Sequence, residues 1–358
     1  MRCAAQDPVS RREGNPPLQV CELEPGRYEQ WDRFVIEHPH GSPFHLIAWM
    51  KSIQETFGFR PLYRVAVSGG SVRGVLPLFL VRNVLMGKVL LSSPFAVYGG
   101  ILADSPEALA ALRDDVRALG ESLEVQYVEL RNAYPEQCAG FAPITRYVTF
   151  TRAVSEDEAA ILPSLEKNNR YMVQKAQKHQ FAMRKSTDIG AFCELLAVTY
   201  RRLGTPSFPR RHFEALVKHF GAMIDIREVV LEGKVVAASL NFLFREQVHN
   251  FNSGSDFRYK ALAPNNYLYF DLLRWAGKNG YQVFDFGRSK KGTGVFEFKR
   301  HWGTTMRELP YEVLLVRRRE MPNFSPANPK FGLAIKVWQR LPLAVTKRVG
   351  PVLIRLFP

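Results

Sequence analysis

The pattern of apolar and polar residues between 264 and 303 predicts a helix, a turn, a buried strand and a glycine-rich basic loop. Apolar side chains recur at helical spacing at the start of this stretch, at Tyr267, Leu268, Phe270, Leu272, Leu273 and Trp275. Gly280 is placed to end the helix, and residues 283–286 have the composition of a buried strand. The loop 287–294 combines three glycines with three cations, so backbone N–H groups and charged side chains could converge on an anion there. A solvated basic loop is the alternative.

The same order of elements occurs twice along the chain. A Phe-Gly pair at 57–58 precedes a predicted hairpin at 65–80, and a second Phe-Gly pair precedes a hairpin at 229–244. Each hairpin is followed by further strand-like sequence, a helix that ends at Gly120 or Gly280, and a closing strand. These landmarks lie about 160 residues apart, and a repeat of that length indicates a duplicated domain rather than a solenoid.

The chain therefore divides into two domains of α+β class, each built on a mixed sheet. We expect the first domain at 18–145 and its copy at 146–316, with a disordered lead at 1–17 and a basic helical tail at 317–358. The length agrees, since 358 residues allow two domains with sizeable cores. The lead lacks the apolar segment of a signal peptide, and no run of 18 uncharged apolar residues occurs in the sequence.

Cations outnumber acids, with 49 Lys and Arg against 34 Asp and Glu, which gives a net charge of +15. Such an imbalance favours anionic partners such as phosphates, nucleic acid or acidic lipid. Two segments are especially basic: the tail 317–358 has nine cations and one acid, and residues 167–185 have six cations and no acid. The four cysteines, at 3, 21, 138 and 193, lack metal-ligand spacing, so we expect a reduced, cytoplasmic chain without a metal site.

Within the tail, apolar residues alternate with cations in a pattern typical of an amphipathic helix that is interrupted near Pro342 and Pro351. Trp338 suits the interface of an anionic membrane, where the cations would meet lipid phosphates. The sequence therefore predicts peripheral attachment to the inner face of the plasma membrane. A helix packed against the domains, with its cations in water, is an equal alternative.

Each unit's order of helices, hairpin, strand, helix and strand resembles the GNAT acyltransferase fold, and two such units in one chain resemble the FemAB family. The residues that carry the resemblance are Phe44-His45-Leu46, Trp49, Phe57-Gly58, Pro94-Phe95, Tyr98-Gly99-Gly100, Lys167-Asn168-Asn169-Arg170, Lys175-Ala176, Ser253-Gly254-Ser255, Ala263-Pro264, Asn266, Trp275-Ala276, Gly280, Asp285-Phe286-Gly287, Phe298-Lys299 and Trp302-Gly303. The chain is most similar to FemAB-related proteins associated with exosortase and PEP-CTERM systems, which occur with exopolysaccharide genes. FemAB enzymes join aminoacyl groups from tRNA to peptidoglycan precursors, so the resemblance implies an acyltransferase.

Two departures from the family leave the acyl donor open. The chain has no long charged helical hairpin of the kind that some FemAB members use to bind tRNA. The stretch 258–264, where GNAT enzymes hold the pyrophosphate of coenzyme A, contains no glycine that would let the backbone approach closely. Aminoacyl-tRNA, an acyl carrier protein and acyl-CoA all stay open as donors, and we expect no other cofactor.

A GNAT-type reaction brings an amine to an activated acyl carbonyl, and a backbone N–H stabilises the oxyanion where two strands splay apart. No side-chain nucleophile is needed, and the chain has no GxSxG motif. We expect the splay at 250–254. Alternation would put Asn250 and Asn252 on one face of the strand as candidate catalytic amides that a substrate could satisfy. A polar pair that faces solvent at a strand edge is the alternative.

Asp285 is the candidate general base, because it lies at the end of the closing strand beside the glycine-rich loop. Its side chain should point away from Phe284 and Phe286, towards the surface or a cleft, where it could also cap the following turn. His249 and His301 are alternatives, because histidine titrates near neutrality.

The resemblance also implies substrate-binding residues around an inter-domain groove that holds a diphosphate-linked acceptor. The candidates are Lys167, Arg170, Arg288, Ser289, Lys299 and Trp302 in the second domain and Phe95, Tyr98 and Gly99 in the first. Arginine can grip a phosphate with two hydrogen bonds, and lysine contacts it as a point charge. Lys167 and Lys178 share one helix face with Tyr171 and Gln174, which makes either a basic stripe or a solvated face possible.

These features together predict an N-acyltransferase or aminoacyltransferase that acts on an amine of a diphosphate-linked cell-envelope or exopolysaccharide precursor. An acyl-CoA or acyl carrier protein dependent N-acyltransferase of an amino sugar is a second interpretation. A catalytically silent adaptor of polysaccharide assembly at the membrane surface is a third.

Overall fold

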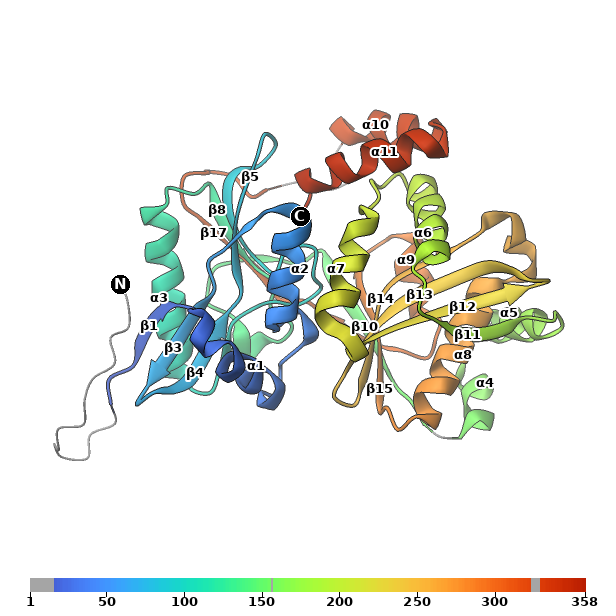
Figure 1. The fold of residues 1–358 in the computed structure, drawn as a ribbon, viewed down its shortest axis with the longest axis horizontal. Coiled ribbons are helices and arrows are strands. Elements are labelled where there is room, and N and C mark those ends of the chain that lie inside the picture. Colours follow the sequence, from blue (N-terminus) through green and yellow to red (C-terminus); the bar gives the residue numbers. More distant parts are fainter. Residues whose placement is uncertain (1–15, 156, 323–328) are drawn as a thin grey trace. The chain divides into compact units, whose positions relative to one another are not determined.

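The computed structural model describes residues 16–155, 157–322 and 329–358, which fall into two units (Figure 1). The first unit holds the chain up to Thr145 together with Leu309–Pro322, and the second holds Arg146–Glu308 together with the C-terminal helices. The predicted lead at 1–17 lies almost wholly outside the described residues.

The first unit contains two sheets and three α-helices (Figure 1). One sheet has the order β1 (Gln19–Glu22), β3 (Arg64–Ser68), β4 (Ser71–Leu76), β7 (Leu102–Ala103). The other has the order β2 (Arg60–Pro61), β5 (Leu78–Asn83), β6 (Gly87–Ser92), β8 (Tyr127–Leu130), β17 (Tyr311–Leu315), β9 (Ala142–Ile144). The helices are α1 (Tyr28–Glu37), α2 (Ile47–Phe57) and α3 (Pro106–Ser122), with short 3₁₀ helices at Pro25–Arg27, Pro43–His45 and Pro135–Gln137. Leu112 and Val116 of α3 belong to the same buried cluster as Leu76, Leu90 and Val128 of the sheets.

The second unit is built on one sheet of seven strands. Its order is β11 (Ala182–Ser186), β12 (Ile224–Leu231), β13 (Lys234–Phe244), β14 (Gln247–Ser255), β15 (Val283–Lys290), β10 (Tyr147–Ala153), β16 (Thr305–Glu308). The helices are α4 (Ile161–Ser164), α5 (Lys167–Gln177), α6 (Gly190–Leu203), α7 (Arg210–Phe220), α8 (Pro264–Lys278), α9 (Gly294–Arg300), α10 (Pro329–Arg340) and α11 (Leu343–Leu353), with 3₁₀ helices at Glu158–Ala160, Gly221–Met223, Phe257–Leu262 and Ile354–Leu356. Leu268 and Leu272 of α8 pack in a core with Val148, Val248 and Phe284.

The chain passes from the first unit to the second and then returns to the first for one strand. After β9 the chain enters β10, which lies in the second unit between β15 and β16. After β16 it enters β17, which lies in the first unit between β8 and β9. The predicted second domain at 146–316 thus differs from the structure at its end, because residues 309–316 complete the first sheet.

The glycine-rich segment 287–294 is more regular than the sequence predicts. Strand β15 continues to Lys290, because β10 offers it pairing partners through Thr149↔Arg288 and Tyr147↔Lys290. A turn with Gly292 at φ 75° then leads into α9. Gly280 ends the preceding helix region at φ 78°, as predicted.

The basic tail packs on the second unit rather than standing apart from it. Helices α10 and α11 both contact α6. The indole of Trp338 is buried and donates from Nε1 to the Thr205 carbonyl at 3.1 Å. The prediction that Trp338 lies at a membrane interface is therefore wrong, because this ring fills a gap against α6. Among the described residues, no helix combines the length and apolar character needed to cross a bilayer.

Candidate functional site

Two parallel strands of the second unit part in the middle of its sheet. β14 and β15 pair through Gln247↔Val283, Val248↔Phe284 and His249↔Asp285. Beyond this point the pairing stops, although β14 continues to Ser255 and β15 to Lys290. The structure therefore confirms a splay at 250–254, and the edge of β14 that turns towards β15 has no strand partner there.

A bulge in β14 separates the two candidate amides. Asn250 pairs with Asn241 and Asn252 with Leu240, so Phe251 is the extra residue of the bulge. Such a residue shifts the alternation of side chains. Asn250 contacts α8, whereas Asn252 contacts α6. The prediction that both amides lie on one face of the strand is therefore wrong.

On the α8 side, hydrogen bonds connect four side chains. Asn250 Nδ2 donates to Asn241 Oδ1 at 2.8 Å, and Asn250 Oδ1 accepts from the Tyr269 hydroxyl at 2.9 Å. The Tyr269 oxygen lies 2.9 Å from Ser253 Oγ. Burial raises the pKa of Tyr269 to about 12, so this hydroxyl keeps its proton. Asn250 thus has partners within the protein for both its oxygen and its nitrogen.

On the α6 side, Asn252 keeps an unused acceptor. Its Nδ2 donates to the Tyr200 hydroxyl at 2.8 Å, but its Oδ1 is buried and has no hydrogen-bond partner among the described residues. Gly254 lets α6 approach this closely, since a Cβ there would fall 2.6 Å from the backbone carbon of Leu195. On the other strand, Ser289 Oγ is likewise buried without a partner among those residues. Both splayed strands thus carry a buried polar side chain that could bind a ligand.

Asp285 lies buried at the point where the strands part, not at the surface or in a cleft as predicted. Its carboxylate accepts from Thr149 Oγ1 at 3.0 Å and from the backbone N–H of Gly287 at 2.7 Å, so it does cap the following turn. His249 Nδ1 lies 3.3 Å from its other oxygen. A carboxylate beside Nδ1 favours the tautomer with its proton on Nδ1, which leaves Nε2 as a proton acceptor.

Lys299 and Arg288 supply charge next to this carboxylate. The Lys299 ammonium is buried and donates to the carbonyls of Gly287 at 2.9 Å and Arg288 at 3.1 Å, which ties α9 to β15. Burial lowers the pKa of Lys299 to about 7; the negative charge of Asp285 acts against this and the charge of Arg288 adds to it. The Arg288 guanidinium lies over the Tyr147 ring, 4.8 Å from its centroid.

The remaining candidates of the second unit lie away from the splay or in the core. Trp302 is fully buried, with its ring near Tyr269 and Phe298, so it packs in the core, and its role in binding a substrate stays a prediction. Arg170 donates to the carbonyls of Pro163 and Leu165. Lys167 is exposed on α5.

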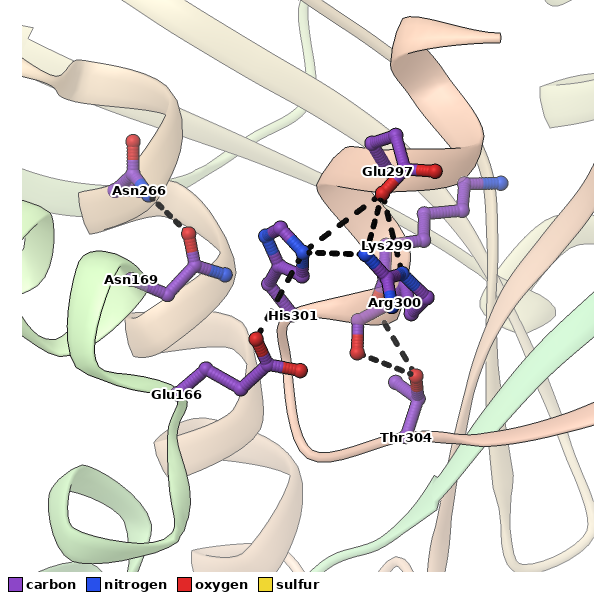
Figure 2. A network of polar contacts seen from close by, with 8 residues as sticks. All are labelled: Glu166, Asn169, Asn266, Glu297, Lys299, Arg300, His301 and Thr304. Atoms are coloured by element: carbon purple, nitrogen blue, oxygen red, sulfur yellow. Dashed lines mark hydrogen bonds and ion pairs between the residues drawn. The ribbon is translucent and has the colours of Figure 1, made fainter. Parts of the chain in front are cut away.

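Figure 2 shows a surface cluster at the start of α5 and around α9, from which the Lys299 side chain runs away. His301 Nε2 lies 3.7 Å from Glu166 and 3.8 Å from Glu297, so this histidine is engaged by two carboxylates. Arg300 pairs with the same Glu297 at 2.8 Å. Asn266 donates to Asn169 at 3.4 Å, which links the starts of α8 and α5.

In the first unit, Phe95, Tyr98 and Gly99 lie together in the segment that follows β6, and all are buried. Phe95 has a positive φ of 65° and packs against Phe57, with 4.5 Å between ring centroids. A Cβ at Gly99 would fall 2.5 Å from Ser93 Cβ. These side chains form packing contacts within their own unit, and their role in binding an acceptor stays a prediction.

Sequence reasoning missed Tyr269, Tyr200 and Thr149. Tyr269 has only a weak signal, because it is a hydroxyl-bearing residue between the apolar Leu268 and Phe270. Tyr200 and Thr149 have none, since only the fold brings them to Asn252 and Asp285. No cluster of three or more His, Cys, Asp or Glu in the described part of the chain is arranged to hold a metal ion.

Comparison with known proteins places this geometry in a known fold. The model of the acetyltransferase (GNAT) domain family matches residues 164–300. The crystal structure of FemX is similar with a TM-score of 0.67 at 16% identity, over 88% of this chain and 100% of that one. L-PGS from Bacillus licheniformis has a TM-score of 0.53 at 14% identity, over 92% and 100%. A tandem GNAT protein from the clavulanic acid biosynthesis pathway has a TM-score of 0.52 at 11% identity, over 86% and 100%. No curated protein matches the sequence.

The matched domain, 164–300, contains both splayed strands and the residues between them. The similar structures extend the likeness to both units, because they cover 88%, 92% and 86% of this chain. The prediction of a GNAT-type acyltransferase with a duplicated domain is confirmed at the level of fold and enzyme class. The chain thus has a FemAB-like tandem GNAT fold, with an acyltransferase domain in its second half.

Proposed function

We propose that the protein transfers an acyl or aminoacyl group to an amine of a diphosphate-linked precursor of the cell envelope or of an exopolysaccharide, and that the second unit binds the donor. The observation that carries this proposal is the splay of β14 and β15, where Asn252 Oδ1 and Ser289 Oγ are buried without hydrogen-bond partners among the described residues. Buried polar atoms are almost always paired in folded proteins, so a ligand is a natural partner here.

The transfer itself needs no side-chain nucleophile. The acceptor amine attacks the acyl carbonyl of the donor, a C–N bond forms, and the C–O bond to tRNA or the C–S bond to a thiol breaks. The oxygen or sulfur that leaves takes up a proton, and the amine loses one. The open edge of β14 beyond His249 offers backbone N–H groups for the developing oxyanion.

His249 is the base that this geometry favours, and Asp285 acts as a positioning residue. The carboxylate is held by Thr149 and Gly287, so it fixes the imidazole at the point where the strands part. The Lys299 ammonium lies near the same carboxylate and titrates near neutrality. The cationic Arg288 side chain is the candidate contact for the diphosphate.

The test is a transfer assay read by mass spectrometry. The chain is incubated with aminoacyl-tRNA, an acyl carrier protein thioester or acyl-CoA, together with amine acceptors that carry a diphosphate. We expect a mass gain on one acceptor with one donor class, lost in His249→Ala and strongly reduced in Asn252→Ala. Lys234→Ala, at the exposed start of β13, is the matched control.

Transfer that survives both site substitutions would contradict the site. No transfer with any donor class, by a chain that is folded, would favour the adaptor interpretation. Transfer from acyl-CoA or an acyl carrier protein alone would support the amino-sugar interpretation.

A further inference from the structure

The C-terminal helices α10 and α11 have an inner face and an outer face. The inner face packs on the second unit through Trp338, Thr346, Gly350 and Ile354, all of which are buried. Gly350 is needed there, because a Cβ would fall 2.6 Å from Ser207 Oγ. The inner face therefore attaches the tail to the second unit, and the outer face is exposed.

The outer face carries a stripe of aliphatic side chains. The exposed members are Leu333 and Val337 on α10 and Val345, Val349 and Val352 on α11. Their spacing of three or four residues puts each set on one side of its helix. Leu333 is 74% exposed and Val352 is 66% exposed, which is unusual for branched aliphatic side chains.

Cations flank this stripe. Lys336, Arg340 and Arg348 are exposed on the same two helices, and residues 329–358 contain no Asp or Glu. The nearest acidic partner in this region is Glu194 of α6, which pairs with Lys347. The outer face therefore combines exposed aliphatic area with uncompensated positive charge.

We propose that the outer face of α10 and α11 docks on a bilayer that contains acidic lipid. Its aliphatic stripe would enter the headgroup region, while Lys336, Arg340 and Arg348 meet lipid phosphates. A second copy of the chain is a poor occupant, because two such cationic faces repel each other. Nucleic acid is also poorly matched, because the exposed side chains are aliphatic rather than the aromatic rings on which bases stack. This proposal does not depend on the transfer reaction.

Because Trp338 is buried, the docking has no aromatic anchor, and we expect it to be reversible and sensitive to salt. Each cation near an anionic surface is worth about 1 kcal/mol, which corresponds to about fivefold in the partition coefficient. Lys336→Glu and Arg340→Glu should therefore each weaken binding by about fivefold or more.

The experiment is co-sedimentation of the full chain with vesicles of phosphatidylcholine alone or mixed with phosphatidylglycerol. We expect binding to the mixed vesicles, little binding to phosphatidylcholine, and partial release by salt. The double variant Leu333→Asp/Val352→Asp should lose roughly tenfold or more, since it replaces aliphatic contacts with charge. Val84→Asp is the matched control, because Val84 is a 95% exposed valine in the turn between β5 and β6.

Three results would overturn the proposal. The first is a wild-type chain that stays in the supernatant with mixed vesicles. The second is a Leu333→Asp/Val352→Asp variant that binds as the wild type does. The third is a dimer, seen by light scattering, that this double variant dissociates, since the face would then be an interface between copies. Thermal melts should match the wild type, because both positions point away from the core; a variant that unfolds is replaced by Val337→Asp/Val349→Asp.

Discussion

The two copies of the domain differ at the end of their central pair of parallel strands. In the first unit, β6 and β8 pair through Leu90↔Val128 and Leu91↔Glu129, and both strands end within a few residues. Arg131 then bridges the two ends, with its backbone N–H on Ser92 Oγ at 2.8 Å and its guanidinium on the carbonyls of Ser93 and Ala96. In the second unit, the corresponding strands continue and separate.

The difference shows what duplication has preserved and what it has changed. Both copies keep the parallel pair at the centre of the sheet, because the core depends on it. The first copy fills the space beyond the pair with its own chain, which Arg131 holds through Ser92, Ser93 and Ala96. The second copy separates its strands and leaves Asn252 Oδ1 and Ser289 Oγ without hydrogen-bond partners among the described residues, and we expect the acyl donor there.

The largest expected effect concerns the independence of the copies. A chain cut between Thr145 and Arg146 leaves the first copy without β17, whose Tyr311 and Val313 are buried in that unit. Glu312 of β17 also accepts from the N–H groups of Ala139 and Phe141 at 2.7 and 2.8 Å. We expect residues 16–145 alone to be unfolded by circular dichroism, and the same residues joined by a linker to 309–322 to fold. A cooperative melt of residues 16–145 alone would show that β17 is dispensable for the folding of the first copy.

The next effect compares one arginine in each copy. Arg131 is buried and pairs with Glu129 at 2.9 Å, so Arg131→Ala should lower the free energy of unfolding by about 3–5 kcal/mol. Arg288 stacks on Tyr147, and Arg288→Ala should cost only about 1 kcal/mol of stability while it abolishes binding of a diphosphate acceptor. Urea unfolding and calorimetric titration measure the two effects. Equal destabilisation by both substitutions would remove the distinction between the copies at this position.

A pH dependence should appear in the second copy. Lys299 titrates near pH 7 when folded and at its ordinary value of 10.5 when unfolded. Between these values the unfolded chain binds a proton that the folded chain does not, so the free energy of unfolding rises with pH by up to about 1.4 kcal/mol per unit. Below pH 7 both states are protonated and the contribution is constant. Urea unfolding of the wild type and of Lys299→Met, at several values above neutrality, should show this slope in the wild type alone; parallel curves would mean that the ammonium is not desolvated.

The smallest effect separates the two amides of the splay. Asn250→Ala removes the hydrogen bonds of Asn250 to Asn241 Oδ1 and to the Tyr269 hydroxyl, and should destabilise the fold by about 1–2 kcal/mol. Asn252→Ala removes one hydrogen bond, to the Tyr200 hydroxyl, together with an already unsatisfied oxygen, so stability should change by less than about 1 kcal/mol while transfer falls. Thermal unfolding ranks the two variants. The reverse order would assign Asn252 to structure and Asn250 to the substrate.

Local patterns were sufficient to predict the duplication, the helix that became α8, and the position of the splay. Helical spacing, Gly280 and the polar run at 250–254 are all properties of neighbouring residues. The return of β17 to the first sheet could not be predicted in this way, because the partners of a strand depend on the whole sheet. The extension of β15 to Lys290 has the same cause.

The chemistry of single residues depended on features that the sequence does not reveal. The bulge at Phe251 places Asn250 and Asn252 on opposite sides of the sheet. No residue type in this segment predicts the bulge. Asp285 and Lys299 have ionisable side chains that are buried in the structure. Asp285 is stabilised there by hydrogen bonds from Thr149 and Gly287, and Lys299 by a hydrogen bond to the Arg288 carbonyl. Trp338 was expected at a membrane interface and Trp302 in a binding site, because tryptophan is common in both places. Both side chains are buried in the structure.

Hydrogen exchange in the presence of each donor class tests the central claim most directly. Aminoacyl-tRNA, an acyl carrier protein thioester and acyl-CoA are added in turn, and exchange is followed by mass spectrometry of peptides from both copies. We predict that one donor slows exchange at 250–255 and 286–290, while residues 89–96 of the first copy stay unchanged. Protection at 89–96, with none on β14 and β15, would contradict the assignment of the donor site to the second copy.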